Sequence, residues 1–229
     1  MTELTHKQWL DNEYSEWVKA LKESTVHNFK EHPGVRRMLS LDLDRLVFWD
    51  QVERWANGDM KLVDTIAKID LIGYEKLPTI LPTGIGFRNI YYATEVLKLN
   101  PSSICEIGGG VGQFYATLRA LGFEGNYMIK DIIEVELFQI KYLEEVEKQT
   151  GLELPQFEGA RVDLLVSFYA LGEFDAAKRQ RYEQLIDETP HGYIAWNPHS
   201  GASDSLSIFE NHDIKVTPGI EPGVSIIEW

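Results

Sequence analysis

The sequence contains a glycine-rich run whose residue types and spacing suit ligand binding. Residues 106–112 read Glu-Ile-Gly-Gly-Gly-Val-Gly, and they lie between a short apolar run at 104–107 and an expected helix at 114–121. Glycine lets the backbone turn tightly and approach a ligand, and the first N–H groups of a following helix have no partner within that helix. Because ligands of parallel sheets bind at the carboxyl ends of the strands, the run predicts a binding site there.

The spacing of the glycines separates the candidate ligands. A dinucleotide fingerprint needs Gly-x-Gly-x-x-Gly, and both frames available here place another residue at the last glycine position. A Walker phosphate loop needs a Gly-Lys-Ser/Thr sequence, which does not follow the run. What remains is an acid-x-Gly-x-Gly-x-Gly pattern, in which Glu106 is the acid and Gly108, Gly110 and Gly112 are the spaced glycines.

This pattern resembles motif I of the class I S-adenosylmethionine-dependent methyltransferases. Asp131 ends the next expected strand and resembles the acid that binds the ribose hydroxyls of the cofactor in that fold. A carboxylate can accept from two vicinal hydroxyls, so the residue type suits this role. The resemblance implies S-adenosylmethionine as the cofactor, with Glu106 near its methionine moiety and further contacts from Ile132 and Ser167.

A narrower resemblance is to the sugar O-methyltransferase family. It is carried by the runs at 104–113, 127–131, 139–143 and 163–167, and by a helical region that precedes the core. The chain departs from that family at Ser167, where the family tends to have Asn, and at Ile132, where it tends to have Pro. The resemblance implies a small-molecule acceptor, with a sugar hydroxyl as the leading candidate.

Methyl transfer to a hydroxyl benefits from a general base, because a sugar hydroxyl is a poor nucleophile at neutral pH. The base must lie beyond the carboxyl ends of the later parallel strands. His199 is our first candidate, since an unperturbed histidine titrates near neutrality, and Glu173 is the second. Each has an alternative interpretation, because His199 lies in a turn-like Asn-Pro-His-Ser-Gly run and Glu173 suits the first turn of a helix.

Four further residues are candidates for contact with the acceptor. Arg88 and Tyr92 lie on the expected helix that precedes the first core strand, and Tyr169 and Asn197 follow two later strands. The alternative for the tyrosine is packing of an amphipathic helix against the sheet.

Several partner and site classes are disfavoured. Lys plus Arg number 22 and Asp plus Glu number 36, so the net charge of −14 repels nucleic-acid phosphates. The Asn/Asp-Pro-Pro-aromatic loop of nucleic-acid amino-methylating enzymes is absent after the strand expected at 162–168. The single cysteine, Cys105, excludes a disulfide scaffold and a thiolate metal cluster. Asp175, Asn197 and Asp204 match no metal motif, so no metal is predicted.

The remaining pattern predicts the elements that position these residues. Apolar residues at helical spacing predict helices near residues 9–21, 43–56, 60–69 and 87–97, and strand–helix alternation follows from residue 104. Strands are expected at 104–107, 126–132, 162–168, 193–196, 214–216 and 224–229, and helices at 114–121, 135–149 and 176–186. The alternation predicts an α/β fold with a mostly parallel sheet. The resemblance implies that this sheet is the Rossmann-like class I methyltransferase sheet, with an antiparallel last strand.

The Pro- and Gly-containing run at 73–86 predicts a boundary between two parts of the chain. Residues 1–85 are expected to form a helical region that acts as a lid or a homodimer contact, and residues 86–229 the cofactor-binding core. No apolar run is long enough to span a membrane and the first residues carry no secretory h-region, so a cytoplasmic protein is expected. The alternative function is a non-catalytic, methyltransferase-like module that binds the cofactor or a protein partner.

Overall fold

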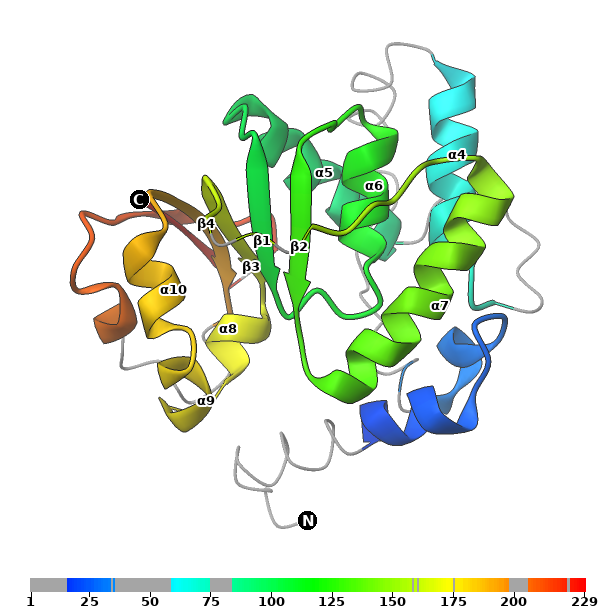
Figure 1. Ribbon diagram of the computed structural model, residues 1–229, viewed down its shortest axis with the longest axis horizontal. Coiled ribbons are helices and arrows are strands. Elements are labelled where there is room, and N and C mark those ends of the chain that lie inside the picture. The colour runs from blue at the N-terminus through cyan, green and yellow to red at the C-terminus, as the bar shows by residue number, and fades with distance from the viewer. Residues whose placement is uncertain are drawn as a thin grey trace.

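A six-stranded sheet with helices on both faces forms the centre of the molecule (Figure 1). The computed structural model describes residues 16–33, 35, 59–74, 84–157, 159, 161–174, 176–197, 206–221 and 223–229. Residues 16–23 are helical. The other helices are η1 (Phe29–Glu31), α4 (Met60–Leu71), α5 (Gly84–Lys98), α6 (Gln113–Ala120), α7 (Ile133–Thr150), α8 (Ala170–Glu173), α9 (Ala176–Gln180), α10 (Glu183–Glu188) and η3 (Leu206–Phe209). The strands are β1 (Ser103–Ile107), β2 (Asn126–Lys130), β3 (Leu164–Phe168), β4 (His191–Trp196), β5 (Lys215–Pro218) and β6 (Ser225–Glu228).

The order of the strands confirms the predicted fold class. The sheet runs β2-β1-β3-β4-β6-β5, with β1 parallel to β2 and β3, and β3 parallel to β4. The last strand, β6, is antiparallel both to β4 and to β5, with which it forms a hairpin. The turn of this hairpin lies beside Trp196, the last residue of β4, because Trp196 pairs with Ser225. The hairpin therefore returns to the carboxyl edge, where the parallel strands end.

The connections reverse direction at β1. The chain passes from β1 to β2 on one side and later places β3 on the other side of β1. Loops that leave β1 and β3 therefore diverge at the carboxyl edge, which is where open α/β sheets bind ligands. The glycine-rich run follows β1 directly, so it lies at this switch point.

Alternation along the strands separates two hydrophobic cores. Ile104 of β1 packs in one core with α5, α6 and α7, whereas Cys105 and Ile107 pack in the other with α8, α10 and η3. Helix α4 contacts the outer side of α6 and α7 (Figure 1). Within the described ranges, no helix combines the length and the hydropathy that crossing a bilayer would need.

The predicted elements differ from the structure at several points. The helix expected at 176–186 divides into α9 and α10, because the ring of Tyr182 stacks on Phe174 at a centroid distance of 5.7 Å and the chain turns there. The strand expected to reach Ile132 ends at Lys130, since the Ile132 N–H donates to the side chain of Asp131 instead of a neighbouring strand. The short helix α8 was not predicted. The helix expected at 43–56 and most of the 73–86 boundary lie outside the described residues.

The described part of the region before residue 86 shares the core of the sheet. Ala20, Leu21 and Val35 are buried in the same core as the residues of α6 and α7. The ring of Phe29 lies edge-on against Phe138 of α7, with ring centroids 5.0 Å apart. This part of the chain is therefore packed on the core and is not a separate layer.

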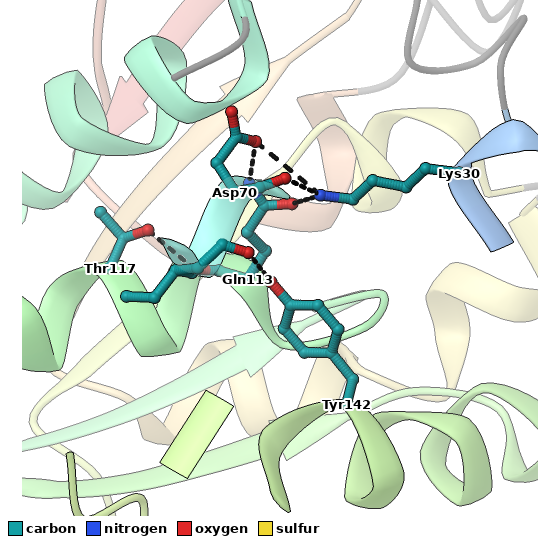
Figure 2. Close-up of polar contacts among 6 residues, drawn as sticks. Lys30, Asp70, Gln113, Thr117 and Tyr142 are labelled. Carbon is teal, nitrogen blue, oxygen red and sulfur yellow. Dashed lines mark hydrogen bonds and ion pairs between the residues drawn. The ribbon is translucent and has the colours of Figure 1, made fainter. Parts of the chain in front are cut away.

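A buried polar cluster ties η1 to α4 and α6 (Figure 2). The Lys30 ammonium donates to the backbone oxygen of Asp70 and, at 3.2 Å, to Oε1 of Gln113, and it lies 3.8 Å from Oδ1 of Asp70. The amide of Gln113 in turn donates to Asp70 at 2.6 Å, and the hydroxyl of Tyr142 donates to the Ile69 backbone at 2.7 Å. Burial lowers the pKa of Lys30 to about 8, although Asp70 opposes the shift. Gln113 directly follows the glycine-rich run, so this cluster stabilises the end of the loop.

Candidate cofactor and acceptor site

The three spaced glycines adopt backbone conformations that favour glycine. Gly108, Gly110 and Gly112 have φ angles of 73°, 55° and 89°, in the left-handed region. A Cβ at Gly108 would clash with the side chain of Ala170, and one at Gly112 would lie 3.0 Å from Leu143. Gly108 and Gly112 are therefore required both by conformation and by packing.

Gly110 differs from its neighbours because the space beside it is open. Among the residues that the structure describes, none other than its chain neighbours has an atom within 4 Å of the position that a Cβ would take there. Its N–H donates to Oδ2 of Asp131 at 2.9 Å, and its carbonyl accepts from Nε2 of Gln139 at 2.8 Å. The top of the loop is thus fixed by the side chain of Asp131, which follows β2, and by that of Gln139 on α7, while its outer surface is open to a ligand.

Asp131 lies where the sequence places it, directly after β2 and next to the loop. Its second carboxylate oxygen accepts from the N–H of Ile132 at 2.8 Å. Burial raises the pKa of Asp131 to about 6, although the two backbone donors favour the ionised form. Each oxygen has one protein donor and can accept a second hydrogen bond, so the carboxylate can still bind a pair of vicinal hydroxyls. Ile132 is partly buried beside it.

Glu106 supports the loop from beneath. Its side chain is only 2% exposed, and its Oε2 accepts from the hydroxyl of Tyr127 at 2.8 Å. A Cβ at Gly109 would lie 2.7 Å from the same oxygen, so the carboxyl packs directly under the glycines. Burial raises the pKa of Glu106 to about 8, against the Tyr127 hydrogen bond and with a smaller contribution from the Asp131 charge. The carboxyl therefore holds its proton at neutral pH.

Ser167 is fully buried at the fourth position of β3. Its hydroxyl accepts from the N–H of Leu171 at 3.1 Å and so stabilises the start of α8. The side chain has no exposed surface, and the hydroxyl that we assigned to the cofactor is used within the protein.

Three of the four candidate acceptor residues meet around one carboxylate. Tyr92 and Tyr169 both donate to Oε2 of Glu221, the former at 2.9 Å, and their hydroxyls lie 3.1 Å apart. Arg88 Nη1 lies 3.7 Å from Oε1 of Glu221, and its guanidinium lies 4.6 Å from the centroid of the Tyr169 ring. Burial raises the pKa of both tyrosines, so they remain neutral donors.

This cluster lies beside the glycine loop. Tyr169 directly follows β3, and the next residue, Ala170, occupies the space that a side chain at Gly108 would need. The ring of Phe168 stacks on Tyr92 at 4.9 Å and contacts Phe114 of α6 at 4.3 Å. Tyr169 has a φ of 76°, an uncommon conformation for a residue other than glycine that is often found at binding sites.

The remaining candidates are not joined to this cluster by a described contact. Glu173 is the last residue of α8 and partly buried, and Asn197 directly follows β4. The backbone of Asn197 packs closely on Gly172, where a Cβ would lie 3.1 Å from its nitrogen. His199 lies outside the described residues.

Sequence reasoning did not identify Glu221, Gln139 or Tyr127. Glu221 lies in the turn between β5 and β6, and Gln139 lies on an acid-rich helix, so neither carries a local motif. Tyr127 and Ile129 point to the same side of β2, and Ile129 pairs with Glu106 on β1. This alternation could have placed Tyr127 close to Glu106.

Two other features do not belong to this site. A cavity of 370 Å³ lies at the opposite, amino edge of the sheet, where it is lined by the first residues of β3 and β4, Leu164 and His191. In the part of the chain that the structure describes, no group of three or more His, Cys, Asp or Glu side chains is placed to hold a metal ion.

Comparison with known proteins shows similarity at the level of fold. No protein-family model matches the sequence, and no curated protein matches it either. A solved structure of the cofactor-bound protein Rv0187 from MTB matches with a TM-score of 0.50 and 14% identity, over 82% of this chain and 97% of that one. The SAH-bound methyltransferase PaMTH1 of Podospora anserina matches with a TM-score of 0.49 and 12% identity, over 82% and 97%. A SAM-dependent methyltransferase of Aquifex aeolicus matches with a TM-score of 0.40 and 18% identity, over 61% and 90%.

These identities relate the chain to its structural neighbours by fold alone. The neighbours include S-adenosylmethionine-dependent methyltransferases. With its mostly parallel order and antiparallel last strand, the sheet has the Rossmann-like arrangement that the sequence predicts.

Proposed function

We propose that this chain is an S-adenosylmethionine-dependent methyltransferase that acts on a hydroxyl of a small molecule, with a sugar as one candidate. The observation that carries the proposal is the loop after β1. Its three left-handed glycines lie at the sheet's switch point, and a side-chain carboxylate, that of Asp131, fixes the N–H of Gly110. SAM- or SAH-bound structures among the neighbours of this fold support the same cofactor.

The residues present suit this cofactor. The open space at Gly110 leaves room for a ligand against the loop, and Asp131 retains capacity to accept ribose hydroxyls. When Glu106 holds its proton, it has no negative charge that could neutralise the sulfonium of the cofactor. Its proposed role is therefore to support Gly109 and the rest of the loop. Ile132 would pack beside the bound nucleoside.

Bound S-adenosylmethionine would supply a methyl group on a sulfonium centre, which makes methyl transfer an in-line displacement. The protein's own task is then to align the acceptor oxygen with that methyl group and to exclude water. The tyrosine and arginine cluster at the end of β3 lies beside the loop and supplies polar groups for such an acceptor. His199 and Glu173 remain our candidates for the general base.

We also propose that the region before residue 86 covers the site. Lys30 contacts Gln113, the first residue of α6 and the neighbour of Gly112, so movement of this region would reach the loop. The second proposed role of this region is a contact between the two copies of a homodimer. Three exposed apolar side chains, Ile133, Leu137 and Ile140, follow one another along α7 and support such a contact.

Transfer of a labelled methyl group tests the proposed function. The purified chain would be incubated with S-adenosylmethionine labelled in its methyl group and with separate pools of sugars, nucleotide sugars and catechols. We expect label in at least one hydroxylated pool and none in duplex RNA. Cofactor binding without transfer to any pool would favour the non-catalytic alternative. Absence of cofactor binding would contradict the proposed methyltransferase and favour a module that binds a protein partner.

A further inference from the structure

Two buried polar atoms of the Arg88–Glu221 ion pair have no hydrogen-bond partner among the described residues. They are Nε of Arg88, a donor, and Oε1 of Glu221, an acceptor. Buried polar groups in folded proteins are almost always hydrogen-bonded, and one that is not calls for a physical explanation. Here the donor and the acceptor that make no hydrogen bond belong to the same ion pair. Its charged atoms, Nη1 of Arg88 and Oε1 of Glu221, lie 3.7 Å apart.

The surrounding groups explain why these two atoms are not satisfied internally. The hydroxyls of Tyr92 and Tyr169 both bind the other oxygen of Glu221, Oε2, and so hold the carboxylate in one orientation. The guanidinium lies over the Tyr169 ring, which fixes Arg88 beside it. Glu221 is 8% exposed and Arg88 is 19% exposed, so a ligand would approach the pair from the side of the more exposed arginine.

We propose that the Arg88–Glu221 pair anchors a hydroxyl of the methyl acceptor, and that the acceptor is a neutral ring compound. A hydroxyl is the simplest group that satisfies both atoms, because its O–H donates to Oε1 and its oxygen accepts from the Nε–H. This inference rests on the proposed function and names the substrate class for it. An acceptor that bears a carboxylate or phosphate is disfavoured, since its charge would face Glu221 in a chain of net charge −14.

The aromatic surroundings favour a ring. Tyr92 stacks on Phe168 at 4.9 Å, and Tyr193 and Tyr169 lie edge-on to Tyr92 at 6.3 and 6.4 Å. Of these side chains, Phe168 and Tyr169 are only partly buried, and the flat apolar faces of sugar and phenol rings pack well against such aromatic side chains. The cluster also adjoins the glycine loop through Ala170 and Gly108, so an anchored acceptor would lie next to the proposed cofactor.

Binding of simple probes tests the anchor without requiring turnover. Catechol and methyl α-D-glucopyranoside would serve as neutral hydroxylated rings, and benzoate and glucose 6-phosphate as anionic counterparts of similar size. Each would be titrated by NMR or calorimetry into the full chain, with and without saturating S-adenosylhomocysteine. The variants are Glu221→Gln and Arg88→Lys, and Glu210→Gln is the matched control, because Glu210 is exposed and lies outside the cluster.

We expect at least one neutral probe to bind more tightly than its anionic counterpart. Glu221→Gln and Arg88→Lys should each weaken that binding about tenfold or more, and Glu210→Gln should leave it unchanged. Circular dichroism would confirm that each variant is folded, and Arg88→Lys provides the test if Glu221→Gln is not. Failure of every neutral probe to bind, equal binding by the folded variants, or preference for the anionic probes would overturn the proposal. If the wild-type chain binds a neutral probe but does not bind S-adenosylhomocysteine, the proposed function is contradicted and the hydroxyl anchor is not.

Discussion

At the scale of single residues, the buried carboxyl of Glu106 links the stability of the protein to pH. Its pKa is about 8 in the folded chain against an ordinary value of 4.5. Between these two values the folded state holds a proton that the unfolded state releases. The free energy of unfolding therefore falls as pH rises from about 5 to about 8, since the contribution of this group is complete at low pH and lost as pH passes its folded pKa.

Glu106→Gln should remove most of this dependence while keeping the hydrogen bond from Tyr127. Urea unfolding of the wild-type chain at pH 5, 6, 7 and 8 should show a loss of stability from this group of about 3–4 kcal/mol, and the variant should show a flatter profile. Glu124→Gln is the control, because Glu124 is exposed. Parallel profiles for the wild type and Glu106→Gln would show that the carboxyl is ionised in the folded state.

Gly110 offers a test of ligand contact that separates conformation from binding. Gly110 and Gly122 both have positive φ, 55° and 98°, and both have open space where a Cβ would lie. Replacement of either by alanine should cost a similar, modest amount of stability, about 1–2 kcal/mol. Only Gly110→Ala should also weaken S-adenosylhomocysteine binding, by about tenfold or more, because only its Cβ enters the proposed site. Calorimetry gives the affinities, and equal binding by both variants would place the ligand elsewhere.

At the scale of elements, the segment around η1 is fixed by one buried cation. Lys30 is 2% exposed and pairs with Asp70, so Lys30→Met removes the cation beside a buried carboxylate. Breaking a buried ion pair in this way typically costs about 3–5 kcal/mol. Lys22→Met is the matched control, since Lys22 is 63% exposed and lies 3.9 Å from Glu134, a pair expected to contribute about 1 kcal/mol or less. Urea unfolding compares the two, and equal losses would show that the Lys30 cluster does not anchor the segment.

The elements also show what the sequence alone could predict. The strands β1 and β3 and the helices α4 and α7 follow from local patterns of apolar residues, and the glycine loop with Asp131 follows from spacing. The ion pair of Arg88 with Glu221 does not, because it joins α5 to a hairpin turn that reaches the carboxyl edge only after β6 pairs antiparallel with β4. The break between α9 and α10 depends likewise on a tertiary contact, the stacking of Tyr182 on Phe174.

At the scale of the whole molecule, the shared core predicts cooperative unfolding. Residues on both sides of the expected 73–86 boundary, such as Leu21, Ile69 and Tyr127, pack in one cluster. Far-ultraviolet and near-ultraviolet circular dichroism should therefore report coincident thermal transitions, as two-state unfolding requires. A separate early transition that disappears with the residues before 86 would show instead that this region is an independent unit.

Cofactor binding by the whole chain is the measurement that decides the proposed function most directly. S-adenosylmethionine, S-adenosylhomocysteine and NAD would each be titrated into the purified chain by calorimetry. We expect one site with micromolar affinity for the first two and no measurable binding of NAD, because the glycine spacing fails the dinucleotide pattern. Binding of NAD in place of the other two, or no binding of any of the three, would contradict the assignment of the loop to S-adenosylmethionine.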